Sequence, residues 1–167
     1  LLDPFNPTGS TKHVAFNTSK DTYKTDPRKS HLNLVVTDSD WEGQFARAAE
    51  SHPAVLSYAK NQGLGLEVPY LLGSDQRRYL PDFLLKIDDG KGEDDHLNLI
   101  VEIKGYLGED AKVKAETMRT YWIPGVNRLK KFGRWAFLEI TEPYSMDSDI
   151  SDLILEKLNE ALPLQTQ

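Results

Sequence analysis

Residues 97–104 read Leu-Asn-Leu-Ile-Val-Glu-Ile-Lys, and this run carries the most information about the fold. Its aliphatic residues predict a largely buried β-strand. Because side chains alternate along a strand, Glu102 and Lys104 project from one face, while Leu99, Val101 and Ile103 supply the opposite, apolar face. Burying a carboxylate and an ammonium costs free energy unless they are paired or bound to a metal, so this strand indicates a functional site.

A second apolar run precedes this strand. Residues 79–87 read Tyr-Leu-Pro-Asp-Phe-Leu-Leu-Lys-Ile, and the polar residues 88–96 connect them to the first run. If the two runs pair as antiparallel neighbours, Asp82 lies across from Glu102. Two close carboxylates repel each other, and a divalent cation that prefers oxygen ligands, such as Mg²⁺, removes that repulsion. The pairing therefore predicts a hard-metal site.

Such a site has the parts needed to hydrolyse a phosphodiester. A bound cation polarises a phosphoryl oxygen and lowers the pKa of a bound water. Lys104 is placed to orient that water or to stabilise the charge that develops on the phosphorus oxygens.

The flanking sequence predicts the rest of an α/β fold, in which a central mixed sheet is flanked by helices. A strand at residues 66–72 would complete an antiparallel meander with 79–87 and 97–104, because the connections are short. Helical spacing and caps predict the helices, and a last apolar run predicts a strand parallel to 97–104. In chain order, the other elements are a strand at 31–36, helices at 40–51 and 53–63, a helix at 111–131 broken at Pro124, the last strand at 132–140 and an amphipathic helix at 147–162.

Composition narrows the function classes. The net charge is −6 and the pI is about 5.2, which argues against a general polyanion-binding surface, so contacts to nucleic acid must be local. The absence of Cys excludes a thiol nucleophile and a thiolate zinc site. The lack of Cys also fits a reducing cytoplasm. No apolar run is long enough to cross a bilayer, so we expect a soluble protein without a membrane partner. The chain begins at Leu1 rather than Met, and we expect it to derive from a longer protein.

Several blocks of sequence resemble one nuclease group. The chain resembles the PD-(D/E)XK nuclease superfamily, whose core is a helix, a three-strand antiparallel meander, a second helix and another strand. More narrowly, it is similar to the C-terminal endonuclease domain of type III restriction subunits. The resemblance covers about residues 30–142. Its blocks are Asp38-Ser39-Asp40-Trp41-Glu42, Lys60-Asn61-Gln62-Gly63-Leu64-Gly65, Tyr79-Leu80-Pro81-Asp82-Phe83, Val101-Glu102-Ile103-Lys104-Gly105-Tyr106 and Gly133-Arg134-Trp135-Ala136-Phe137.

The superfamily resemblance implies roles for individual residues. It implies that Asp82, Glu102 and the backbone carbonyl of Ile103 hold Mg²⁺, for which Mn²⁺ would substitute. Lys104 would be catalytic, and Glu42 in the first helix would be an auxiliary acid, with Glu50 as the weaker candidate for that position. DNA cleavage would leave 5′-phosphate ends. Residues that would contact the DNA backbone are Lys112, Lys114 and Arg119.

The type III resemblance implies a larger bacterial cytoplasmic enzyme. It implies double-stranded DNA as substrate, a methyltransferase (modification) subunit as partner and an ATP-dependent motor domain in the parent chain. This chain has no phosphate-binding Gly-Lys-Ser/Thr loop, so ATP would be used by that motor and not here. We divide the chain into a lead-in segment at 1–38, the nuclease domain at 39–142 and a C-terminal helical extension at 143–167.

Simpler interpretations stay open at this point. Glu102 and Lys104 could form an ordinary ion pair on a solvated face, and Glu42 could be a first-turn acid favoured by the helix dipole. The acidic residues 88–95 lack the ligand spacing of a calcium loop and predict a solvated hairpin tip. The basic residues after 104 serve phosphate binding or plain solvation. The whole chain could be a catalytically silent DNA-binding or docking module, or an enzyme that acts on RNA or on branched DNA.

Overall fold

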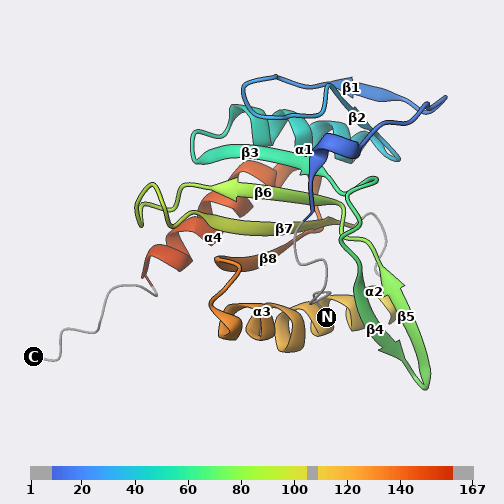
Figure 1. The fold of residues 1–167 in the computed structure, drawn as a ribbon, viewed down its shortest axis with the longest axis vertical. Helices are drawn as coiled ribbons and strands as arrows, with labels where there is room; N and C mark the ends of the chain where they lie inside the picture. The colour runs from blue at the N-terminus through green and yellow to red at the C-terminus, as the bar shows by residue number, and fades with distance from the viewer. Residues whose placement is uncertain (1–8, 105–108, 160–167) are drawn as a thin grey trace, which may run out of the picture.

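The computed structural model describes residues 9–104 and 109–159, and it has a mixed sheet with helices on both faces (Figure 1). This architecture confirms the α/β class with a central mixed sheet flanked by helices. None of the helices described is both long enough and apolar enough to span a bilayer.

The elements follow each other in an order close to the predicted one. Strands are β1 (Thr22–Lys24), β2 (Leu34–Val36), β3 (Val55–Lys60), β4 (Val68–Leu72), β5 (Asp75–Tyr79), β6 (Phe83–Ile87), β7 (Leu97–Ile103) and β8 (Arg134–Ile140). Helices are α1 (Asp40–Ser51), α2 (Glu109–Thr117), α3 (Ile123–Leu129) and α4 (Met146–Asn159), with a π-helical turn at Met118–Trp122 and 3₁₀ turns at Thr11–His13 and Pro143–Ser145.

The central sheet has the strand order β3-β6-β7-β8. β6 pairs antiparallel with β3 and with β7, and Phe83 lies opposite Val101. β8 pairs parallel with β7, with Leu97 opposite Arg134 and Glu102 opposite Glu139. The predicted antiparallel pairing of 79–87 with 97–104 and the parallel placement of 132–140 are therefore confirmed.

The prediction of a helix at 53–63 is wrong, because Val55–Lys60 form β3, an edge strand of the central sheet. The segment contains Val55 and Tyr58, residue types that favour strands, and it is too short to be stable as a helix by itself. Both side chains are buried, and β3 pairs with β6 from Val55 opposite Ile87 to Lys60 opposite Phe83. Pairing with a distant strand outweighs the local pattern.

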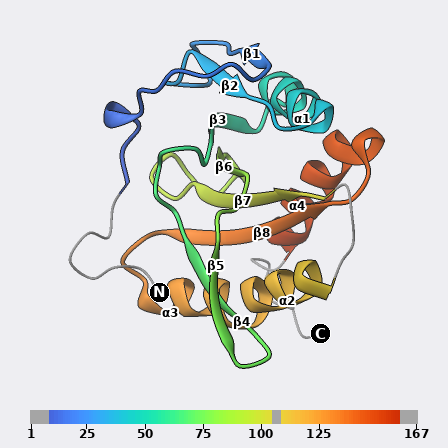
Figure 2. The same cartoon turned by 90° about the vertical axis from the view of Figure 1, so that its right-hand side faces the viewer.

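The first strand of the predicted meander also lies elsewhere. Val68–Leu72 and Asp75–Tyr79 form a separate two-stranded ribbon, β4–β5, which is inserted between β3 and β6 and projects beyond the sheet (Figure 2). The meander of the central sheet is β3-β6-β7 instead. Residues 75–79 form a strand of their own because Gly73, at φ 62°, adopts the left-handed conformation that a tight turn needs.

Two apolar cores sandwich the sheet. On one face, α1 and α4 pack against it, and Phe45 contacts Phe83 with ring centroids 4.8 Å apart. Burying side chains of this size contributes about 1.5–3 kcal/mol each. Ile150 of α4 is fully buried in this core, so the terminal helix completes it, while residues 160–162 of the predicted helix lie outside the described residues. The other core contains Val68, Tyr70, Tyr79, Ile100, Met118, Trp122 and Val126.

The predicted helix at 111–131 is present in three joined parts. α2 passes into the π-helical turn and then directly into α3, where Pro124 is the second residue. Met118 and Trp122 of the π-helical turn are buried against the sheet. α2 and α3 therefore cover the face of β7 that carries Ile100 and, two residues on, Glu102.

Candidate active site

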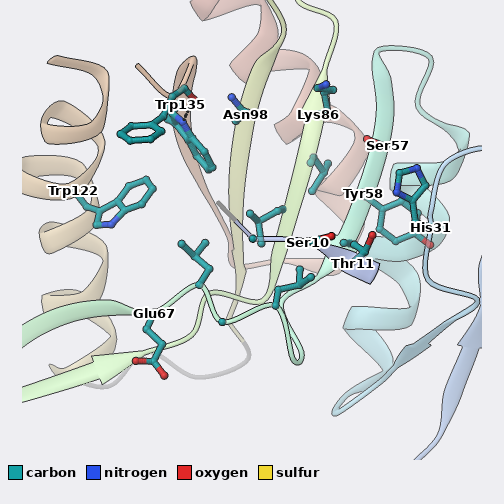
Figure 3. Close-up of a pocket in the computed structure, with 18 of the residues that line it drawn as sticks. Ser10, Thr11, His31, Ser57, Tyr58, Glu67, Lys86, Asn98, Trp122 and Trp135 are labelled. Atoms are coloured by element: carbon teal, nitrogen blue, oxygen red, sulfur yellow. Dashed lines mark hydrogen bonds between the residues drawn. The ribbon is translucent and has the colours of Figure 1, made fainter. Parts of the chain in front are cut away.

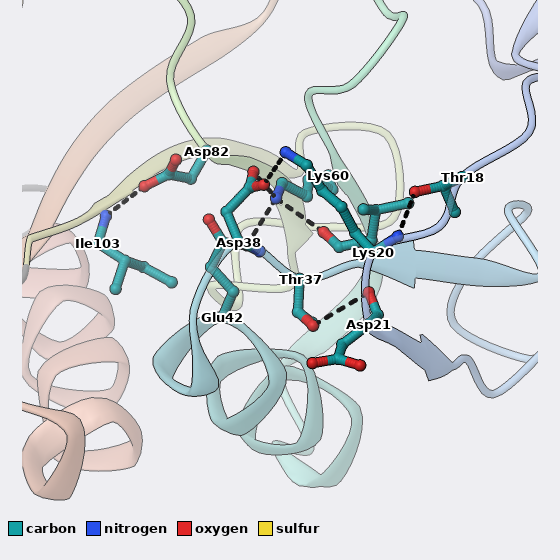
Figure 4. A network of polar contacts seen from close by, with 10 residues as sticks. Thr18, Lys20, Asp21, Thr37, Asp38, Glu42, Lys60, Asp82 and Ile103 are labelled. Atoms are coloured by element: carbon teal, nitrogen blue, oxygen red, sulfur yellow. Dashed lines mark hydrogen bonds and ion pairs between the residues drawn. The ribbon is translucent and has the colours of Figure 1, made fainter.

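Asp82 and Glu102 lie at the same end of the β6–β7 pair. β6 begins at Phe83, opposite Val101, so one further step places Asp82 opposite Glu102. Asp82 Oδ2 accepts a hydrogen bond of 2.7 Å from the N–H of Ile103 (Figure 4). The Asp82 carbonyl accepts one of 2.7 Å from the N–H of Asn61. The structure thus brings together the two carboxylates that the strand pairing predicted.

The carboxylate of Glu102 is incompletely satisfied. Its Oε2 is buried and has no hydrogen-bond partner in the protein. Burial first, and the charge of Asp82 second, raise the pKa of Glu102 to about 8. Burial likewise raises the pKa of Asp82 to about 6, against the hydrogen bond from Ile103, with Glu42 adding to the rise. The two groups resist being charged together unless a cation joins them.

Lys104 is buried, and its partner is a residue that the sequence did not single out. Its Nζ lies 2.5 Å from Glu139 Oε2 and donates a hydrogen bond of 2.8 Å to the Ala111 carbonyl. Glu139 is aligned with Glu102 by the parallel register of β8. The interpretation of Glu102 and Lys104 as an ion pair on a solvated face is therefore wrong. In the sequence, Glu139 is the one acid in the otherwise apolar segment 135–140. Its role as the partner of Lys104 can be recognised only once the β7–β8 register is known.

Glu42 belongs to a second polar cluster, with Asp38 and Lys60, which Figure 4 shows near Asp82. It is buried in the first turn of α1, where its Oε2 lies 2.6 Å from Lys60 Nζ and accepts a bond of 2.7 Å from the N–H of Asp38. Lys60 also donates to the Val36 carbonyl at 2.7 Å and to Asp38 at 2.9 Å. A dipole-favoured surface acid does not account for a buried ion pair of this kind.

Lys60 escaped prediction because its segment was expected to be helical. As a residue of β3 opposite Phe83, it reaches α1 across the sheet face that the helix covers. Glu50, the weaker candidate for the auxiliary acid, is committed elsewhere. Its carboxylate accepts hydrogen bonds from Tyr23, Tyr58 and the N–H of Asp26.

The donor set fits a small, hard cation. Two carboxylates meet at one strand end, and one buried oxygen there lacks a partner, which a cation or its water would supply. Ile103, whose carbonyl was expected to be a ligand, contacts Asp82 through its N–H. Within the described ranges, no three Asp, Glu or His side chains form a ready-made cage. Water molecules would therefore complete the coordination, as is usual for Mg²⁺.

The basic residues of α2 and the π-helical turn differ in their surroundings. Lys112 is exposed. Lys114 pairs with Asp110 at 3.0 Å and lies 5.6 Å from the ring centroids of both Tyr70 and Tyr79. Arg119 is exposed, 3.9 Å from Glu139. Lys112 and Arg119 are thus the side chains of the three predicted DNA contacts that are most open to a phosphate.

The hairpin at 88–95 is not simply a solvated tip. Asp89 is fully buried, and the guanidinium of Arg134 donates two hydrogen bonds of 2.6 and 2.7 Å to its carboxylate. Arg134 also bonds Asp95 at 2.8 Å. The charge of Arg134 is therefore used to anchor this hairpin to β8, not to present a cation to solvent.

A large cavity among the described residues lies away from the carboxylates. It has a volume of about 1320 Å³ and runs over the sheet between β3 and α3, where Figure 3 shows Ser57, Lys86 and Asn98 on one side and Trp122 and Trp135 on the other. None of the predicted catalytic residues lines it. We therefore assign the site from the chemistry of its side chains and not from the size of a cavity.

Comparison with known proteins supports the nuclease interpretation. No curated protein and no solved structure matches the chain. Residues 28–123, more than half of the 167, match the family described as "Endonuclease domain". The matched part contains Glu42, Asp82, Glu102 and Lys104 and ends before Glu139. The chain therefore belongs to this endonuclease domain family.

Proposed function

We propose that the chain hydrolyses DNA phosphodiester bonds and that a divalent cation held by Asp82 and Glu102 is required. The observation that carries this proposal is the pairing of these two half-buried carboxylates at one strand end, with the buried Glu102 Oε2 left without a partner. Unpartnered buried acids are costly, and such a cost is typical of a working site. Membership of the endonuclease domain family supports the same class of reaction.

The cation would be Mg²⁺, with Mn²⁺ as a substitute, and when bound it would supply charge stabilisation and an acidified water. The chain's own contribution is to hold that centre rigid. Asp82 is fixed by the Ile103 N–H, so its carboxylate does not need to be ordered when the cation binds. The carbonyl of Ile103 remains a candidate third ligand.

Lys104 would act on the substrate directly. An ammonium group has three donors, and Glu139 and the Ala111 carbonyl take two of them. We propose that the third donates to the attacking water or to a phosphoryl oxygen. The ion pair with Glu139 keeps Lys104 in one rotamer.

Glu42 would serve as the auxiliary acid, and it would act through Lys60. The buried Glu42–Lys60 pair lies beside Asp82, and the charge of Glu42 acts on the Asp82 carboxylate. A fixed pair at this position sets the local potential around Asp82 without touching the phosphate.

The wider assignment is to the restriction subunit of a type III restriction-modification enzyme of the bacterial cytoplasm. In that setting the substrate is double-stranded DNA, the motor domain of the parent chain uses ATP, and a methyltransferase subunit recognises the site. The support is the ordered set of sequence blocks from 38 to 137.

Cation binding is the first test, because the isolated chain need not cut DNA efficiently. Calorimetric titration of Mn²⁺ into the wild type should show a site that Asp82→Asn and Glu102→Gln abolish. Glu93→Gln, a change of an exposed acid in the 88–95 hairpin, is the matched control and should bind as the wild type does. A wild type that binds no Mn²⁺ would favour a silent module.

Cleavage assays then define the reaction. We expect Mg²⁺-dependent nicking or cutting of supercoiled DNA, lost in Asp82→Asn and Lys104→Gln, with ends that DNA ligase can rejoin. Parallel assays on RNA and on branched DNA decide the substrate. Faster cleavage of RNA than of DNA would refute the DNA assignment while leaving the cation site intact.

The type III context needs the parent protein. Asp82→Asn in that protein should abolish DNA cutting and leave ATP hydrolysis and binding of the methyltransferase subunit unchanged. Loss of ATP hydrolysis in the same variant would argue against separate motor and nuclease parts.

A further inference from the structure

Tyr79 is a buried tyrosine whose hydroxyl group has no partner in the protein. It is the last residue of β5, paired with Val68 across the β4–β5 ribbon, and only 5% of its surface is exposed. Its Oη is among the buried side-chain oxygens without a hydrogen bond in the part of the chain described. Buried tyrosine hydroxyls normally have a hydrogen-bond partner. An unpartnered one indicates that a ligand or a water molecule supplies the missing hydrogen bond.

Tyr79 packs on the sheet face that carries the carboxylate centre. Tyr79 packs in the same core as Ile100, which shares a face of β7 with Glu102 two residues further on. Burial is the main cause that raises the pKa of Tyr79 well above its ordinary value. The charges of Glu102, Asp82 and Glu139 raise it further. No hydrogen bond joins Tyr79 to any of these three carboxylates in the described residues, although Glu102 Oε2 is also unsatisfied.

The ring of Tyr79 is fixed in place. Tyr70 packs edge-on against it, with centroids 5.9 Å apart, and Lys114 Nζ lies 5.6 Å from its centroid. Lys114 is itself held by Asp110 at 3.0 Å. A hydroxyl on so constrained a ring is pre-oriented, and ordering it on ligand binding costs little.

We propose that Tyr79 is a positioning residue of the cation centre, whose hydroxyl hydrogen-bonds a water molecule bound to the cation between Asp82 and Glu102. This inference rests on the proposed function. A hard cation such as Mg²⁺ keeps several of its waters, and each needs partners in the surrounding protein. Tyr79 Oη and Glu102 Oε2 are two unpartnered groups that such a water would satisfy together.

The proposal gives the β4–β5 ribbon a function. The ribbon is outside the central sheet, and it ends at Tyr79, three residues before Asp82. It therefore holds Tyr79 on the sheet face of the carboxylates. It thereby places a neutral hydrogen-bonding group among several carboxylates, where a further acid would add repulsion.

The test is Tyr79→Phe in the full chain, read by Mn²⁺ titration and by thermal unfolding without metal. We expect Mn²⁺ affinity to fall about tenfold, the size of effect that groups bonded to metal ligands usually have. Because the variant loses a buried hydroxyl with no partner, its Tm without metal should equal or exceed that of the wild type. A purely structural role for the hydroxyl would instead lower that Tm.

Tyr70→Phe is the matched control, since Tyr70 is on the same ribbon, is buried and lies under the same lysine. It should bind Mn²⁺ within twofold of the wild type. If Tyr79→Phe also binds within twofold while Asp82→Asn loses the site, the role of Tyr79 is refuted and the proposed function stands. If the wild type binds no Mn²⁺, the proposed function fails and the role of Tyr79 with it.

Discussion

Lys104 Nζ lies 2.5 Å from Glu139 Oε2, so a catalytic candidate on β7 is held by a carboxylate from the neighbouring parallel strand β8. Both side chains are largely buried, at 6% and 14% exposure. A pair of this kind stabilises only while both members are present, because either one alone leaves an uncompensated charge.

The first prediction concerns Glu139→Gln. The amide keeps a hydrogen-bond acceptor for Lys104 but removes the opposing charge, so unfolding in urea should show a loss of about 1–3 kcal/mol. Mn²⁺ binding should persist, because the Glu139 carboxylate is engaged with Lys104. Glu142→Gln, at an exposed position just after β8, is the control and should change neither quantity. Loss of Mn²⁺ binding in Glu139→Gln would make Glu139 a ligand.

The second prediction is a pH dependence of stability in the absence of metal. The folded chain holds the protons of Asp82 and Glu102 up to pKa values of about 6 and about 8, above the unfolded values near 4. The folded state therefore binds more protons than the unfolded state from about pH 4 to about pH 8, and the free energy of unfolding falls as pH rises through this range.

Chemical unfolding with a chelator present, from pH 5 to pH 9, measures this slope. Glu102→Gln should flatten the upper part of the curve, and saturating Mg²⁺ should flatten it in the wild type by favouring the charged carboxylates. A wild-type stability that rises over this range would show that the two carboxylates are not held protonated.

The third prediction concerns the buried cluster around Lys60. Lys60→Met leaves Glu42 without its cation, and we expect a loss of about 3–5 kcal/mol in the free energy of unfolding. Lys20→Met removes the exposed partner of Asp38 and should cost less than about 1 kcal/mol. Equal losses in the two variants would contradict the burial argument.

The fourth prediction concerns DNA binding. Lys112 is exposed on α2, so Lys112→Ala should weaken DNA binding equally for different sequences and reduce the slope of log K against log salt concentration by about 1. Fluorescence anisotropy over a salt series measures this slope. Lys24→Ala, on β1 at the far side of the molecule, should leave the slope unchanged (Figure 1). An unchanged slope in Lys112→Ala would exclude a phosphate contact.

Local patterns sufficed for elements whose partners are close in sequence. The bounds of α1 match the prediction at both ends because a polar first turn and the periodic Phe45 and Ala49 define it. The pairing of β6 with β7 followed from a short polar connection, and with it the meeting of Asp82 and Glu102. These features need only alternation and chain reach.

The parts that escaped prediction depend on distant pairing. The local pattern of residues 55–60 predicts a helix, and only the pairing with β6 makes this segment the strand β3. As part of that strand, Lys60 faces α1. Glu139 becomes the neighbour of Glu102 only through the register of β8, which follows a long crossover through α2 and α3. Tyr79 is brought to the site by the turn of the β4–β5 ribbon, whose packing has no periodic signature.

The parallel pairing of β8 also has a consequence for the order in which the protein matures. Contacts between strands close in sequence form quickly, whereas a parallel pair separated by two helices forms late because the intervening loop must first be ordered. Asp82 and Glu102 can therefore meet in an early hairpin, but Lys104 acquires Glu139 only when β8 docks. In a chain still emerging from the ribosome, Asp82 and Glu102 would already be paired while Lys104 had no carboxylate partner. The docking of β8 therefore completes the sheet and forms the Lys104–Glu139 ion pair in one folding event.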